Sequence, residues 1–163
     1  MKERLTQAEV GPEAILDSQQ EWFWEGNVQE AFCRWLRLEG WSIIQAVDTA
    51  RKQRGTDIVA EREGIRAHLE VKGYPSKMYS DPRRRGEQKR TNPSLQAKHW
   101  FAHALLKVCQ LREIHPHDRV GLVYPDIDRY RTLADSVATT LREIRLDLYF
   151  VSEDGLVDFV ALA

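Results

Sequence analysis

The chain has 163 residues, of which 42% are hydrophobic and 30% are charged, and its formal net charge is −1. A domain near this size buries roughly 70% of the surface that its unfolded chain exposes, so we expect a single domain. The composition excludes a disordered chain and a membrane-embedded one, and the balanced charge does not by itself indicate a nucleic-acid partner.

The N-terminal residues and the cysteines both favour the cytoplasm. Residues 1–20 form a polar extension that contains acids and lacks the apolar run of a signal sequence or a membrane span. Cys33 and Cys109 lie within helical patterns and lack the spacing of metal ligands, which favours a reducing compartment over a disulfide framework. We therefore expect a cytoplasmic protein that does not engage membranes.

One helix and three strands are predicted in the first half of the chain. The helix ends near Gly40, a residue type that stops helices, and its apolar stripe is Trp24, Val28, Phe32, Trp35 and Leu36. A strand is predicted over 41–47. Two more strands, over 57–60 and 67–72, form a hairpin that turns around Glu63 and Gly64.

A basic loop over 74–92 follows, and its prolines, glycine and arginines make it too interrupted for regular structure. Loops of this length in compact domains are usually functional or disordered. Asn92 then offers an N-cap, with Pro93 at the first position of a long helix whose predicted buried side is Leu95, Phe101, Ala102, Leu105, Val108 and Cys109.

The remaining chain alternates strands with a helix. A strand is predicted over 120–124, and Asp126 can cap a third helix that carries Tyr130, Leu133, Val137, Leu141 and Ile144. Strands over 146–151 and 156–162 flank a turn at 153–155. This order predicts an α/β fold with a mixed central sheet flanked by helices, an antiparallel hairpin, and mainly parallel pairing in the second half.

The predicted hairpin brings acidic and basic side chains to one end of the sheet. Asp57 opens one strand, and the alternation of the next strand places Glu70 and Lys72 on the face opposite Leu69 and Val71. An Asp and a Glu that converge at a strand end can anchor Mg²⁺, which supplies the charge neutralisation and water activation that phosphodiester hydrolysis needs. Lys72 could orient or deprotonate the attacking water, or stabilise charge on the phosphate.

Asp57, followed at hairpin distance by Glu70-Val71-Lys72, resembles the motif of the PD-(D/E)XK, or restriction-endonuclease-like, nuclease superfamily. The predicted order over 25–124 is similar to that family's core of helix, three strands, helix and strand (α-β-β-β-α-β), here with an additional C-terminal helix and strands. The resemblance implies Mg²⁺-dependent cleavage of DNA, with Mn²⁺ as a substitute, and leaves open whether an endonuclease or an exonuclease is present. It also implies that Asp57, Glu70 and the Val71 carbonyl bind the metal, and that Lys72 lies at the attacking water. The first motif reads Gly-Thr-Asp rather than Pro-Asp, which leaves the subfamily open.

Three further residues fit positions that such nucleases use. Glu25 and Gln29 lie four residues apart on one helical face, with Glu30 as a competitor, and we favour Glu25 as the additional acid. Gln96, near the start of the second long helix, occupies a place where the family sometimes has a glutamine.

Two basic clusters flank the predicted site, and phosphate contacts from Lys and Arg supply most sequence-independent affinity for nucleic acids. They are Arg51, Lys52 and Arg54 before Asp57, and Lys77, Arg83, Arg84, Arg85, Lys89 and Arg90 after Lys72. DNA is the expected partner, RNA is not excluded, and a homodimer would suit cleavage of two strands. Two alternatives stay open: a non-catalytic nucleic-acid-binding or protein-docking module on the same fold, and a structural domain whose charged hairpin is merely exposed.

Overall fold

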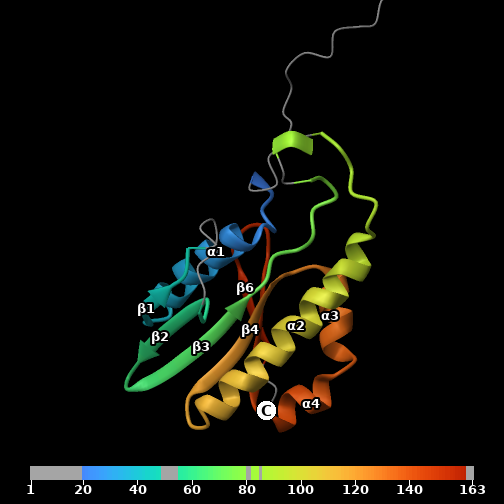
Figure 1. Cartoon of the computed structure of the whole chain (residues 1–163). Coiled ribbons are helices and arrows are strands. Elements are labelled where there is room, and N and C mark those ends of the chain that lie inside the picture. Colours follow the sequence, from blue (N-terminus) through green and yellow to red (C-terminus); the bar gives the residue numbers. More distant parts are fainter. Residues whose placement is uncertain (1–19, 49–54, 80–81, 85, 161–163) are drawn as a thin grey trace, which may run out of the picture.

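Six strands form one mixed sheet in the order β1-β2-β3-β4-β5-β6 (Figure 1). The computed structural model describes residues 20–48, 55–79, 82–84 and 86–160. The strands are β1 (Ser42–Ala46), β2 (Ile58–Arg62), β3 (Ile65–Val71), β4 (Arg119–Pro125), β5 (Leu146–Val151) and β6 (Val157–Val160). The helices are α1 (Glu25–Leu38), α2 (Pro93–Ile114), α3 (Asp128–Asp135) and α4 (Ala138–Glu143), with a short 3-10 helix η2 (Pro82–Arg84). The order α1-β1-β2-β3-α2-β4 confirms the expected α/β core.

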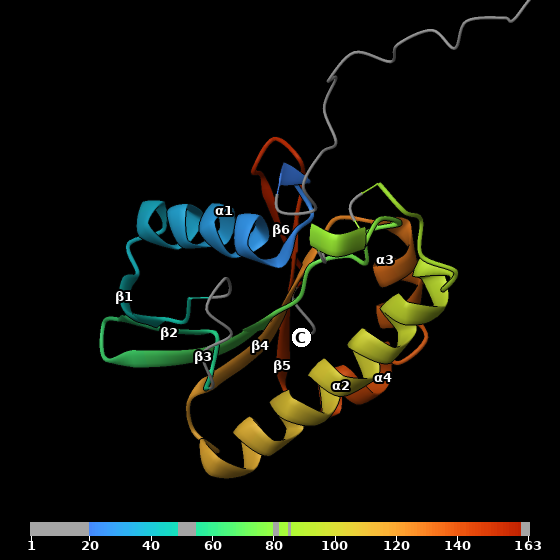
Figure 2. The same ribbon diagram turned by 45° about the horizontal axis from the view of Figure 1, so that its top comes forward.

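Helices cover both faces of the sheet: α1 lies on one face, and α2, α3 and α4 lie on the other (Figure 2). The apolar stripe of α1 packs on alternate residues of the hairpin, and this core includes Phe32, Leu36, Ile58, Leu69 and Val71. The core on the opposite face includes Phe101, Val108, Tyr124, Leu141 and Phe150. Because successive strand residues point to opposite faces, the side chain of Glu70 is turned away from α1 and towards α2.

The hairpin of β2 and β3 forms as predicted. Arg62 pairs with Ile65 across the turn, and both turn residues have positive φ, 52° at Glu63 and 78° at Gly64. A two-residue turn with this backbone matches the right-handed twist of antiparallel strands. The parallel pairing of β4 with β3 and with β5 is also confirmed, while β5 and β6 form an antiparallel hairpin.

The third helix was predicted as one element and is in fact two short helices, α3 and α4. Asp126 does not cap it, because Ile127 is the N-cap residue and the Asp126 carboxylate instead pairs with Arg131 at 2.5 Å. The break follows α3, where the Ser136 hydroxyl donates to the Leu133 carbonyl at 2.6 Å and Val137 leaves the helical backbone conformation. The kink lets Leu141 of α4 reach the core.

Most predicted element boundaries agree with the structure to within two residues. Asn92 caps α2, and its side chain accepts a hydrogen bond from the Ser94 N–H. Leu95 and Ala102 are exposed rather than buried, because the face that α2 packs inwards carries Ala97, Phe101, Ala104, Val108 and Leu111. The last predicted strand corresponds to β6, and residues 161–163 lie outside the described part of the chain.

The loop over 74–92 contains more regular structure than its composition predicted. Met78 and Gln88 form an antiparallel bridge, and the Lys89 N–H donates to the Lys77 carbonyl at 2.8 Å. We call the described residues of this segment, 77–79, 82–84 and 86–90, the basic hairpin. It extends from the end of β3, beyond the start of α2 (Figure 1). No helix in the described part of the chain combines the length and apolar character needed to cross a membrane.

Candidate active site

Two carboxylates meet at the open end of the β2–β3 hairpin. Asp57 immediately precedes β2, and its Oδ2 accepts a 2.8 Å hydrogen bond from the Val71 backbone N–H. The Glu70 side chain is only 1% exposed and the Asp57 side chain 14% exposed. The hairpin register therefore brings together two acids that are 13 residues apart in the sequence and shields both from water.

Lys72 joins these acids to a third one. Its Nζ lies 2.8 Å from Glu70 Oε1, 3.6 Å from Glu25 Oε2 and 3.9 Å from Asp57 Oδ2. It also donates a 2.9 Å hydrogen bond to the Val71 carbonyl. Sequence reasoning predicted the meeting of these five residues, and the structure brings all of them together.

A second lysine, Lys107 of α2, contacts the same acids, and sequence reasoning missed it. Its Nζ forms a close ion pair with Glu70 Oε2, lies 3.8 Å from Asp57 Oδ1, and donates to the Gly55 carbonyl at 2.8 Å. The signal that could have revealed it is helical spacing, since Trp100, His103 and Lys107 fall on one face of α2. The cluster thus contains three carboxylates and two ammonium groups.

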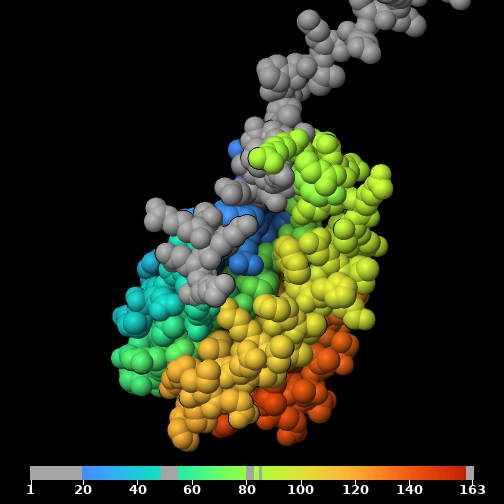
Figure 3. All heavy atoms as spheres, in the orientation of Figure 1, coloured from blue at the N-terminus to red at the C-terminus, as the bar shows by residue number. Residues whose placement is uncertain are grey.

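Gly73 allows Glu25 to reach this cluster. A Cβ added at Gly73 would lie 2.5 Å from the Glu25 backbone nitrogen and 2.7 Å from the Phe23 carbonyl oxygen, so only glycine permits this approach. The neighbouring Tyr74 N–H donates to the same Phe23 carbonyl at 2.9 Å, which ties the chain after β3 to the start of α1. Figure 3 shows this part of the chain in green between the blue start of α1 and the yellow α2.

Burial raises the pKa values of two of the acids, although lysines lie close to both of them. The pKa of Asp57 is raised to about 6, chiefly by burial and also by the nearby charge of Glu70, while Lys72 opposes the rise. Burial also raises the pKa of Glu25. For Lys72, burial lowers the pKa, but the carboxylates of Glu70, Glu25 and Asp57 outweigh it, so the net shift is upward. Asp57 and Glu25 therefore hold a proton more readily than exposed acids do.

The donor atoms fit a hard divalent cation. Carboxylate and carbonyl oxygens are the ligands that Mg²⁺ prefers, and Asp57, Glu70 and the Val71 carbonyl supply both kinds. The buried Glu70 Oε2 lacks a hydrogen bond of regular geometry, although the Lys107 ammonium lies against it as an ion pair. This oxygen is therefore already oriented towards a cation.

The other helix residues that the sequence suggested for the site are Gln29, Gln96 and Glu30. Gln29 is buried, and its amide donates to the Val47 carbonyl at 2.7 Å, while the Val47 N–H donates to the Asp57 carbonyl at 2.8 Å. Gln29 therefore supports the backbone at Asp57. Gln96 makes no hydrogen bond to the acids within the described ranges. Glu30 is exposed and pairs with Arg34, so Glu25 is the acid of α1 that faces the cluster.

The predicted phosphate-binding residues are only partly described. Arg51, Lys52, Arg54 and Arg85 lie outside the described residues. Lys77, Arg83 and Arg90 are exposed, and Lys89 is half-buried. Arg84 is already engaged, since it pairs with Glu87 at 2.9 Å and lies over the Tyr79 ring at 3.4 Å.

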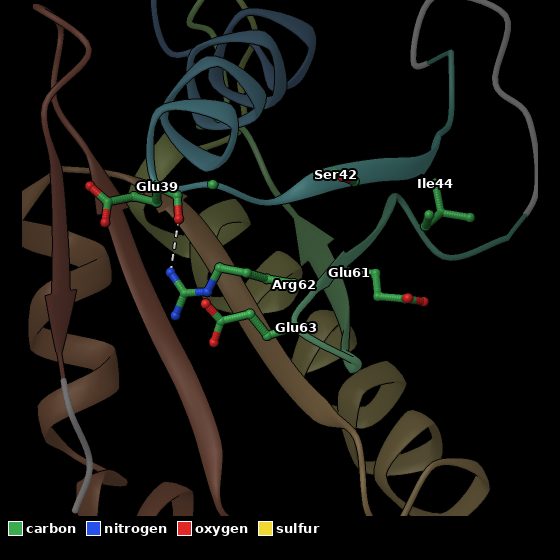
Figure 4. A pocket seen from close by; sticks show the side chains of 7 residues that line it. Glu39, Ser42, Ile44, Glu61, Arg62 and Glu63 are labelled. Carbon is green, nitrogen blue, oxygen red and sulfur yellow. Dashed lines mark hydrogen bonds between the residues drawn. The ribbon is translucent and has the colours of Figure 1, made fainter.

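A different pocket, of about 770 Å³, lies between the end of α1 and the strands β1 and β2 (Figure 4). Glu39, Glu61 and Glu63 line it, and Arg62 donates to the Glu39 carbonyl at 2.8 Å. Figure 4 shows the carboxylates of Glu39 and Glu61 pointing to opposite sides. They do not converge, and this hollow lacks the geometry of a catalytic or metal site.

A histidine cluster lies near the start of β3, on the same face as Glu70. His68 Nε2 lies 2.9 Å from Asp118 Oδ2, and His115 Nδ1 lies 3.7 Å from the same oxygen. The two imidazole rings are stacked, with centroids 3.7 Å apart and planes 11° from parallel. A metal ion lies near the plane of each imidazole that binds it, so rings stacked in this way do not share one ion in this conformation. The cluster instead ties β3 to the turn between α2 and β4.

Comparison of the chain with models of known protein families, with curated proteins and with solved structures found no match. The fold and the site define an α/β protein with a six-stranded mixed sheet, helices on both faces, and a buried cluster of acids and lysines at the end of β3. The geometry of that cluster is therefore the observation from which a function can be inferred.

Proposed function

We propose that this protein is a metal-dependent nuclease that hydrolyses phosphodiester bonds in DNA, on a core of the PD-(D/E)XK type. The observation that carries the proposal is the convergence of Asp57, Glu70 and Lys72, with Lys72 Nζ 2.8 Å from Glu70 and 2.9 Å from the Val71 carbonyl. Glu25 supplies a third acid at the same ammonium.

Each group has a distinct role in this proposal. Asp57, Glu70 and the Val71 carbonyl would hold Mg²⁺, or Mn²⁺ in its place, and the ion would supply charge neutralisation at the phosphate and activation of water. Lys72 orients or deprotonates the attacking water, or stabilises charge on the phosphate. Glu25 balances the charge of Lys72 and fixes the direction of its side chain. Gln29 supports the backbone at Asp57.

The energetics of the cluster support a functional role over a structural one. Removing several charges from water carries a desolvation penalty that their mutual attraction does not always repay, and well-packed apolar residues are often as stable. The raised pKa values of Asp57 and Glu25 indicate that the acids remain under-compensated. Perturbed acids held together at a strand end are typical of catalytic and metal sites.

One observation favours a second candidate, a nucleic-acid-binding or protein-docking module on the same fold that performs no chemistry. Lys107 pairs with Glu70 and lies 3.8 Å from Asp57, so the acids already have an internal counterion. In that alternative the cluster is a closed ion-pair network that binds no metal. The two candidates differ in whether a divalent ion can displace Lys107 from the acids.

A cleavage assay with several labelled substrates tests the proposal. Single-stranded DNA, duplex DNA, a branched junction and RNA are incubated with Mg²⁺, with Mn²⁺ and with a chelator. We expect metal-dependent cleavage that Asp57→Ala, Glu70→Ala or Lys72→Ala abolishes while the fold stays intact. Glu30→Gln, which alters an exposed acid of the same helix, is the matched control and retains activity. Cleavage that survives Asp57→Ala would reject the assignment.

A further inference from the structure

A pocket of about 330 Å³ adjoins the acid and lysine cluster, and its walls come from α1, from α2 and from the residue that follows β3. It is lined by Glu25, Lys72, Trp100 and His103. Small-molecule sites occupy about 300–1,000 Å³, so this space is large enough for one planar heterocycle. Two of the lining residues belong to the proposed active site, and the other two carry aromatic rings on one face of α2.

Trp100 is not explained by packing. It is half-buried, it belongs to neither of the two hydrophobic cores, and it takes part in no aromatic ring pair within the described ranges. The neighbouring Phe101, by contrast, is 5% exposed and stacks on Tyr124. A large indole that lines a pocket beside charged groups is well suited to stack on a flat ligand.

We propose that this pocket takes one unpaired nucleobase beside the scissile phosphate, so that the substrate is single-stranded or carries an unpaired nucleotide at the cleavage position. The inference rests on the proposed nuclease function and narrows its substrate class. A base inside a duplex has both faces covered by its neighbours, so it can enter such a pocket only after it leaves the stack. Lys72 then lies between the base pocket and the acids, where the phosphate attached to that nucleotide arrives.

Binding to oligonucleotides with and without bases tests this inference. The Asp57→Asn protein, which should bind DNA without cleaving it, is titrated in the presence of Mg²⁺ into a fluorescent single strand of 12 nucleotides. The same titration uses a duplex of equal length and a single strand that consists of abasic nucleotides. Fluorescence anisotropy measures each affinity, and the substitutions Trp100→Leu, Trp100→Phe and His99→Ala are added to this background.

We expect tighter binding of the single strand than of the duplex. Stacking of one base on an aromatic side chain corresponds to about a 5- to 150-fold change in affinity, so Trp100→Leu should weaken single-strand binding within that range. Trp100→Phe should restore most of it, and His99→Ala, on the exposed side of α2, should change nothing. The abasic strand should not respond to Trp100→Leu, because it has no base to stack.

An equal loss for the abasic and the base-containing strand would overturn the inference, because Trp100 would then act through structure or charge. No loss for either strand would overturn it as well. Failure of the nuclease proposal looks different: wild-type protein would cleave none of the substrates, whereas binding could still depend on Trp100. If cleavage requires Asp57 but binding ignores Trp100, the base pocket fails and the nuclease proposal stands.

Discussion

At the scale of single residues, the site is defined by two lysines that share three acids in different ways. Lys72 contacts Glu25, Asp57 and Glu70, and it also donates to the Val71 carbonyl. Lys107 contacts Asp57, Glu70 and the Gly55 carbonyl, and it makes no contact with Glu25. Lys72 therefore joins Glu25 to the other two acids, while Lys107 of α2 is a counterion of Asp57 and Glu70 alone.

Removal of Lys107 should strengthen metal binding and preserve cleavage. In Lys107→Met one positive charge near Asp57 and Glu70 is lost, and a unit charge at about 4 Å in a protein environment is worth up to about 4 kcal/mol before relaxation. We expect Mn²⁺ to bind roughly 10- to 100-fold more tightly, as measured by calorimetric titration. Lys72→Met should abolish cleavage, whereas Lys107→Met should retain it.

Lys98→Met, a charge loss at an exposed position of α2, is the control and should leave Mn²⁺ affinity unchanged. If Lys107→Met binds Mn²⁺ no better than wild type, Lys107 is not a counterion that the metal displaces. The closed ion-pair network of the alternative function would then be favoured.

The raised pKa of Asp57 should make the metal-free protein less stable as the pH rises. The pKa of Asp57 is about 6 in the folded protein, against about 3.9 in an unfolded chain, so the folded state holds the proton more tightly. The contribution of this group to the free energy of unfolding is therefore fully present below pH 4, and it is lost as the pH rises from about 4 to 6. The integrated loss from this group is about 3 kcal/mol.

Asp57→Asn should remove most of that decline. The amide oxygen can still accept the hydrogen bond from the Val71 N–H, but it carries no charge to desolvate. Urea unfolding in chelator at pH 4.5 and pH 7.5 should show that the variant is more stable than wild type at pH 7.5 and closer to it at pH 4.5. A variant that is less stable than wild type at pH 7.5 would contradict the claim that burial disfavours the charged form of Asp57.

At the scale of elements, two positions of the β2–β3 region require glycine for different reasons. Gly64 adopts a φ of 78° in the β2–β3 turn, and an added Cβ there would meet nothing within 4 Å. Gly73 has no positive φ, but an added Cβ would lie 2.5 Å from the Glu25 backbone nitrogen. The first glycine sets the register of the hairpin, and the second sets the distance between α1 and the end of β3.

Gly73→Ala and Gly64→Ala should therefore separate stability from activity. We expect Gly64→Ala to destabilise the protein by about 1 kcal/mol through its backbone conformation, with cleavage retained per folded molecule. Gly73→Ala should cost about 1–3 kcal/mol through overpacking and should also reduce cleavage strongly, because it displaces Glu25 and Lys72. Urea unfolding and cleavage rates at saturating Mg²⁺ measure both effects. Equal activity of the two variants would show that the α1 contact does not position the site.

The parts of the site that depend on local pattern could be predicted from the sequence. The period of two in β3 and the turn at Gly64 place Glu70 and Lys72 on one face, and the hairpin register brings Asp57 to Val71. Lys107 could not be found in this way, because its contact depends on how α2 crosses the sheet, and helical periodicity does not encode a crossing angle. The split between α3 and α4 was not predicted either, because the apolar pattern stays periodic across it. The break is accompanied by a side-chain hydrogen bond of Ser136, which the pattern does not encode.

At the scale of the whole molecule, charge is distributed unevenly although the sum is −1. Glu70 is buried and Glu25 and Asp57 are half-buried. By contrast, six of residues 77–90 are Lys or Arg, and this segment extends beyond the end of β3 (Figure 1). A polyanion that approaches this end would meet Lys and Arg side chains before it reaches the acids. Net charge alone does not reveal such a surface, because local fields act over about 10 Å at ordinary ionic strength.

The basic hairpin should therefore contribute to affinity in a salt-dependent way. Lys77 and Arg90 are exposed, while Arg84 is held by Glu87 and Tyr79. Each phosphate contact that is lost lowers the slope of log affinity against log salt by about 0.7 for single strands and 0.9 for duplex DNA. The double substitution Lys77→Gln and Arg90→Gln should reduce the slope by about 1.4 or 1.8, whereas Arg84→Gln should reduce it less.

Anisotropy titrations over a series of KCl concentrations measure these slopes in the cleavage-deficient Asp57→Asn background. The matched control is the double substitution Arg34→Gln and Arg66→Gln, which removes two surface charges that pair with Glu30 and Glu61. Both double variants change the net charge of the molecule by the same amount, so a difference between them reports on position. If both lower the slope equally, DNA responds only to total charge and the basic hairpin has no special role in placing a phosphate near Lys72.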